Sequence, residues 1–174
     1  MEGKAKIEYA QKLFKYNFIG IEELSPFLLK MGVASDSIQR LSLPDLPYSK
    51  EDIEQYSKDH ILILGISRIE DVELSISSIR ERMGLNPELS EPCFYNQDWY
   101  LKEKFINLTL KQKWYLIRKE VFEESRAIQP NELIRQGFLF PSAILCTYTF
   151  FAYYLLFRSV VTVEARGRYV KGVF

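Results

Sequence analysis

Residues 137–157 read GFLFPSAILCTYTFFAYYLLF, an uncharged run of 21 residues between Arg135 and Arg158. A helix of about 20 apolar residues crosses a bilayer, so length alone admits a membrane span. Six side chains of the run carry a hydroxyl group: Ser142, Thr147, Tyr148, Thr149, Tyr153 and Tyr154. If Pro141 sets the start, a helix over 141–157 is about 25 Å long, which falls short of a hydrocarbon core of about 30 Å.

The rest of the chain favours a buried position for this helix. Its other segments are amphipathic and need an apolar element to pack against, and a helix that is apolar all round is typical of the centre of a domain. We therefore predict that Ile144, Phe151 and Leu155 are nearly inaccessible. The alternative is a membrane-associated protein that uses residues 137–157, with basic residues on both flanks and no clear orientation signal.

Composition is that of an ordinary globular domain. The chain has 174 residues, of which 47% are hydrophobic and 26% charged, enough for one domain with a sizeable core. Its 23 basic and 23 acidic residues balance, which makes nucleic acid an unlikely partner. Met1–Tyr16 is charged and amphipathic, with no apolar run typical of a signal peptide, so we expect a cytoplasmic protein.

The first 47 residues are expected to be an N-terminal helical part followed by a loop. Apolar spacing predicts a helix over 4–17 and a second over 21–31, which Pro26 should kink or restart with Ser25 as its cap. The stretch 33–47 is rich in Ser, Asp and Pro and is expected to be a surface loop.

The main body, 48–174, mixes helices and strands. Ser49 and Asp52 fit a capping box for a helix to about Lys58. Residues 60–65, HILILG, are the best candidate for a buried strand, and a second strand is expected over 113–121, both central in the sheet. Further predictions are helices over 75–83 and 130–136, a terminal hairpin from 160–163 and 169–174, and Trp99 and Trp114 in or beside the core.

Few residues are suited to catalysis or metal binding. The chain has one histidine, His60, and two cysteines, Cys93 and Cys146, too few for a disulfide scaffold or a His-built metal site. Cys146 is expected to be a small buried hydrophobe within its helix, and Cys93 the more accessible thiol. Gly65 alone follows the strand, so no phosphate-binding motif is present and we expect neither a cofactor nor a metal.

Polar residues in the second half offer one candidate ligand site. A pocket near Trp114, Arg118, Arg126 and Glu132 is the place where an enzyme would assemble its site from scattered residues. A carboxyl group with a perturbed pKa would mark it. No catalytic residue is assigned within it.

Four motifs occur in an order that resembles a family of uncharacterised bacterial proteins: His60–Gly65, Asp98-Trp99-Tyr100, Trp114–Lys119 and Pro141-Ser142-Ala143. The resemblance covers about 48–157. It implies a soluble bacterial protein of the cytoplasm and brings no known activity, cofactor or catalytic residue.

Together these observations predict one α+β domain over 1–174, with helices around a mostly antiparallel sheet and a buried apolar helix near 141–157. The favoured function is a non-catalytic binding or protein-interaction module that uses an exposed apolar surface, with a homodimer or another protein as partner. The alternatives are an enzyme at the pocket above and a membrane-associated protein.

Overall fold

Three strands form the central sheet of the computed structural model, which describes residues 3–95, 98–120 and 123–164. Their order is β1 (Phe18–Ile19), β2 (His60–Gly65) and β5 (Lys113–Arg118). β1 runs parallel to β2, whereas β2 and β5 form an antiparallel ladder from His60 opposite Arg118 to Gly65 opposite Lys113. A small separate hairpin pairs β3 (Arg68–Ile69) with β4 (Val72–Glu73). The sheet is mixed, with its longer pairing antiparallel, and β2 is central as predicted. The expectation that the strand from Lys113 is also central is wrong, because β5 pairs only with β2 in the described part and lies at the edge of the sheet.

Helices make up most of the remaining elements. The α-helices are α1 (Gly3–Phe14), α2 (Ile21–Lys30), α3 (Ser35–Gln39), α4 (Lys50–Tyr56), α5 (Ile76–Met83), α6 (Pro130–Arg135) and α7 (Ala143–Glu164). Three short 3₁₀ helices are η1 (Lys15–Asn17), η2 (Lys104–Asn107) and η3 (Glu123–Ala127). The predicted α+β class is confirmed.

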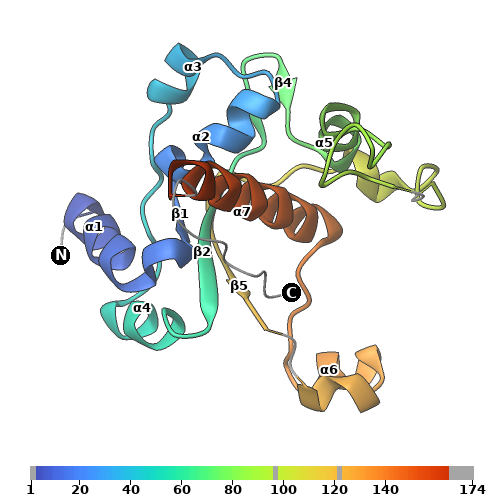
Figure 1. Cartoon of the computed structure of the whole chain (residues 1–174). Helices are drawn as coiled ribbons and strands as arrows, with labels where there is room; N and C mark the ends of the chain where they lie inside the picture. The colour runs from blue at the N-terminus through green and yellow to red at the C-terminus, as the bar shows by residue number, and fades with distance from the viewer. Residues whose placement is uncertain (1–2, 96–97, 121–122, 165–174) are drawn as a thin grey trace.

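The apolar helix α7 crosses the sheet and packs against α2 (Figure 1). Ser142 starts it, because its side chain accepts a hydrogen bond from the Leu145 amide at 3.3 Å and its carbonyl accepts one from Cys146 at 3.0 Å. The Tyr148 hydroxyl donates to the Leu64 carbonyl of β2 at 3.1 Å, and its ring meets Phe27 of α2 edge-on at 5.0 Å. Within the described residues, no helix has both the length and the apolar character needed to cross a membrane.

One hydrophobic core takes residues from Ala10 of α1 through to Ala152 of α7. Ile144, Phe151 and Trp114 are buried as predicted, but Leu155 is only partly buried because α7 extends beyond the edge of the core. Trp99 lies beside the core and not within it, because its side chain is 75% exposed and its ring meets the buried Tyr100 ring edge-on at 5.4 Å.

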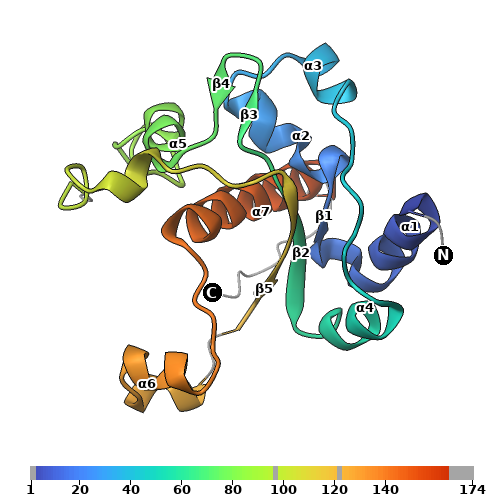
Figure 2. The same cartoon turned by 180° about the vertical axis from the view of Figure 1, so that it is seen from behind.

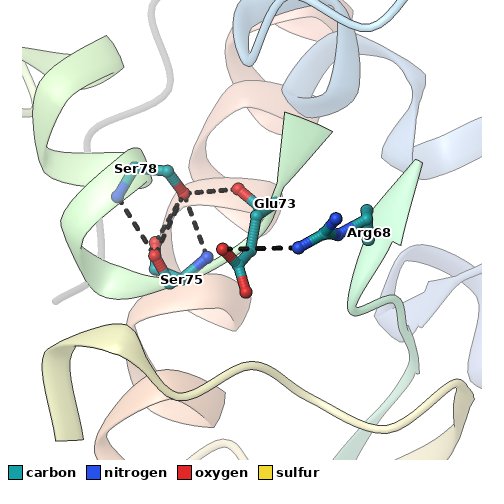
Figure 3. A network of polar contacts seen from close by, with 4 residues as sticks. All are labelled: Arg68, Glu73, Ser75 and Ser78. Atoms are coloured by element: carbon teal, nitrogen blue, oxygen red, sulfur yellow. Dashed lines mark hydrogen bonds and ion pairs between the residues drawn. The ribbon is translucent and has the colours of Figure 1, made fainter. Parts of the chain in front are cut away.

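Side-chain caps explain where two helices begin. Ser49 and Asp52 form the predicted capping box at α4, with amide-to-side-chain distances of 3.0 and 2.9 Å. At α5, Ser75 and Ser78 cap each other, and the Ser78 hydroxyl also donates to the Glu73 carbonyl at 2.6 Å (Figure 3). The Glu73 carboxylate faces Arg68 across the β3–β4 hairpin at 3.7 Å, so the hairpin and α5 are joined through one residue.

Three sequence expectations require correction. The stretch 33–47 is not all loop, because α3 lies within it, started by Ala34 rather than by a side-chain cap. Pro26 does not restart α2, which runs continuously from its Gly20 cap. The predicted strand 160–163 is helical and belongs to α7, while 169–174 lies outside the described residues.

Gly65 is required where β2 and β5 meet. A side-chain carbon at this position would lie 2.5 Å from the Tyr115 ring and 3.0 Å from the Lys111 carbonyl. The only glycine of the HILILG strand therefore serves close strand packing.

Candidate functional site

Trp114 belongs to the hydrophobic core. It is 1% exposed on β5, its ring lies 5.3 Å from the Phe18 ring, and its indole nitrogen donates to the Pro44 carbonyl at 3.0 Å. The indole ring of Trp114 and its one hydrogen-bond donor therefore both have partners within the chain.

Arg118 lies at the end of the β2–β5 ladder, beside the chain's one histidine. His60 Nδ1 is 2.7 Å from Asp59 Oδ1, and Arg118 Nε is 3.9 Å from Asp59 Oδ2. The hydrogen bond to His60, helped by the Arg118 charge, holds the pKa of the Asp59 carboxyl below its usual value. This agrees with a hydrogen-bonded structural histidine, because Asp59 and His60 join α4 to β2 and the Tyr56 ring covers the imidazole at 4.9 Å.

Glu132 lies on α6. Its carboxylate contacts Arg135 and Gln136 of the same helix at 3.3 Å each. Figures 1 and 2 place α6 beyond the end of β5 and outside the body of the molecule. Arg126 lies in η3, with its side chain outside the described parts. A site that combines Trp114, Arg118, Arg126 and Glu132 stays a prediction.

The two thiols differ from expectation. Cys146 is exposed and Cys93 half-buried, the reverse of the predicted order, because Cys146 lies on the face of α7 that points away from the sheet. Partial desolvation nevertheless raises the pKa of the Cys146 thiol. Among the described residues no group of three or more His, Cys, Asp or Glu side chains gathers as metal ligands would.

A groove lies between α1 and α2 and is referred to below as the α1–α2 groove. It consists of two adjoining hollows of about 320 and 410 Å³ that share Gln11, Phe18 and Glu23. The first is completed by Lys15, Tyr16, Leu156 and Phe157, and the second by Ile7, Gly20, Ile21, Glu22, Ser25, Ile38, Gln39, Leu41 and Leu43. Three separate stretches of the chain, 7–25, 38–43 and 156–157, therefore build it.

A polar bridge crosses the groove where the two hollows meet. The Gln11 amide donates to one Glu23 oxygen at 3.0 Å, and the Gly20 amide donates to the other at 2.9 Å. The bond from the Gly20 amide thus holds Glu23 at the start of α2, and the position of this carboxylate follows from the local sequence. Phe18, 3% exposed, forms the apolar floor on both sides.

A second feature is an exposed, largely apolar segment formed by the last two residues of α6 and the five that follow, residues 134–140, referred to below as the arm. Every residue of the arm is exposed, and Leu139 is 95% exposed. Four of the seven are large and apolar: Ile134, Phe138, Leu139 and Phe140. The sequence assigned 137–140 to the long apolar run, although Pro141 separates these residues from the helix that follows. That proline was the signal for a distinct exposed segment.

The comparisons with known proteins are negative. No protein-family model, no curated protein and no solved structure matches the chain. This is consistent with the resemblance to a family without known activity.

Proposed function

We propose that the protein is a non-catalytic interaction module that binds an apolar peptide segment of a protein partner in the α1–α2 groove. The observation that carries the proposal is the groove itself, two adjoining hollows of about 320 and 410 Å³ with an apolar floor and a fixed polar bridge. Volumes in this range suit bound side chains, and a few placed polar groups orient the bound segment.

The shape favours a peptide over a small molecule. The groove runs along two helices and is open to solvent, whereas a small ligand needs a site that encloses most of its surface. Apolar anchors along an open groove, with polar groups at the edge, are typical of sites that bind a helix or an extended segment. Lys15, Glu22 and Glu23 supply charges of both signs along this edge.

Selection from a random twelve-residue peptide library displayed on phage tests the proposal. We expect selected peptides to carry two or three large apolar residues and to bind the purified chain. The Leu43→Asp substitution places a charge in the second hollow and should weaken their binding at least about tenfold, about 1.4 kcal/mol.

The matched control is Leu89→Asp, an exposed leucine outside the groove, which should leave peptide binding unchanged. If the library yields no binder, or if both variants bind as the wild type does, the groove is not a peptide site.

A further inference from the structure

We propose that residues 165–174 of the same chain occupy the α1–α2 groove until a partner displaces them. The inference rests on the proposed function and adds its regulation. This segment, referred to below as the tail, lies outside the described residues and has the sequence ARGRYVKGVF. Its apolar residues, its length and its charge each support the groove as its binding site.

The apolar residues of the tail need a surface that covers them. The pattern of 169–174 predicts a strand that pairs with 160–163. Residues 160–163 instead belong to α7, and a helix makes its backbone hydrogen bonds within itself. The apolar side chains of 169–174 therefore require a different partner surface, since their burial is what stabilises them.

The tail is long enough to reach both hollows of the groove. Phe157, which lines the first hollow, precedes the end of α7 at Glu164 by seven residues, or about 10 Å of helix. The eight steps from Ala165 to Val173 cover at most about 28 Å. Gly167 permits the reversal of direction that a return along α7 requires. The tail can therefore cross the first hollow and enter the second, which adjoins it.

The end of α7 is also placed for this return. Figures 1 and 2 show it beside α2 and β1, and Phe18 of β1 lines both hollows. The chain thus leaves α7 next to the elements that border the groove.

Charge complementarity supports the tail as the occupant. Its three charged residues are all basic: Arg166, Arg168 and Lys171. Glu22 lines the second hollow and has no ion pair among the residues that the structure describes. Lys171 lies between the apolar pairs 169–170 and 173–174, so it can face Glu22 while Val173 and Phe174 enter the second hollow.

Attachment to the same chain makes even a weak contact effective. A short tether raises the local concentration of a binding segment to the millimolar range. A partner peptide must therefore compete with the tail, and the tail lowers the affinity that such a peptide shows for the groove.

Disulfide trapping in the full chain tests the position of the tail. In a Cys93→Ser, Cys146→Ser background, Leu43→Cys places a thiol in the second hollow and Val173→Cys places one on the tail. We expect oxidation by copper–phenanthroline to form an intrachain disulfide, identified by mass spectrometry of tryptic peptides. The control pair Leu89→Cys and Val173→Cys, with Leu89 85% exposed and outside the groove, should oxidise at least about tenfold more slowly.

A charge exchange tests the proposed contact against random collisions of a tethered segment. Lys171→Glu should slow the disulfide between positions 43 and 173 about threefold, the size expected for one exposed ion pair. Adding Glu22→Lys should restore the original rate. A rate that Lys171→Glu leaves unchanged, or that the second substitution does not restore, would contradict the proposed position of the tail.

Binding of a selected library peptide tests whether the tail competes with a partner. Phe174→Asp should raise the affinity of the fluorescein-labelled peptide at least about fivefold, because a charged side chain is unfavourable in an apolar hollow and the tail is released. Fluorescence polarisation measures the change, and Leu89→Asp should bind the peptide as the wild type does. An unchanged or lower affinity of the Phe174→Asp chain would overturn the competition.

Failure of this inference is distinguishable from failure of the proposed function. If peptides bind in the groove but the two cysteine pairs oxidise at equal rates, the tail is not the occupant and the proposed function stands. If the groove pair oxidises selectively but the Phe174→Asp chain binds no peptide, the tail is the occupant and the proposed function fails. A disulfide between two molecules would assign the groove to the tail of a second copy and overturn the contact within one chain.

Discussion

Trp114→Ala should lower the free energy of unfolding by about 3–5 kcal/mol, among the largest effects of any single substitution in this chain. The indole is 1% exposed, and its removal leaves a cavity between β5 and Phe18. It also leaves the Pro44 carbonyl without its donor. Urea unfolding followed by circular dichroism measures the change.

Trp99→Ala is the matched control, because the tryptophan at this position is 75% exposed. This substitution should lower the free energy of unfolding by less than about 1 kcal/mol. Trp114→Phe keeps part of the ring and loses the hydrogen bond, so it stays measurable if the alanine variant does not fold, with an expected loss of about 1–2 kcal/mol. Equal losses for the two alanine variants would contradict the placement of Trp114 in the core.

Phe151→Ala should have a similarly large effect, about 3–5 kcal/mol, while Phe150→Ala should cost less than about 1 kcal/mol. The two phenylalanines are adjacent on α7, yet Phe151 is 4% exposed and Phe150 44% exposed. Phe151 stacks on Phe94 with ring centroids 5.1 Å apart, which ties α7 to the loop after α5.

The difference in destabilisation between the Phe150 and Phe151 variants shows which face of α7 is turned toward the core. A helix surrounded by lipid would not distinguish them in this way, because both rings would lie in an apolar medium. Unfolding free energies of the two alanine variants, compared under the same conditions, therefore test the packed face of α7. Equal effects would mean that the helix has no such face.

Local sequence signals predicted the elements whose causes are local. The capping box from Ser49 to Asp52 and the end of α5 at Gly84 depend on residues within a few positions of each other. Strand β2 could be predicted from its continuous run of apolar residues, because a strand that is buried on both faces has such a run.

Features that depend on distant residues were not visible in the sequence. Trp99 and Trp114 have similar surroundings of charged and aromatic residues, and only the pairing of β5 with β2 determines which one is buried. The α1–α2 groove likewise brings Leu156 and Phe157 to Gln11 across more than 140 positions. The spacing of apolar residues within α1 or within α7 does not show that the two helices meet at this groove.

The contact between α7 and α2 is the centre of this account, since both helices contribute to the core and to the groove. The most direct test is a nuclear Overhauser spectrum of isotopically labelled protein in aqueous buffer. The Tyr148 and Phe27 ring centroids lie 5.0 Å apart, so cross-peaks should join their ring protons. Cross-peaks from the Tyr148 ring only to neighbours within its own helix would contradict the packing of α7 and the fold built on it.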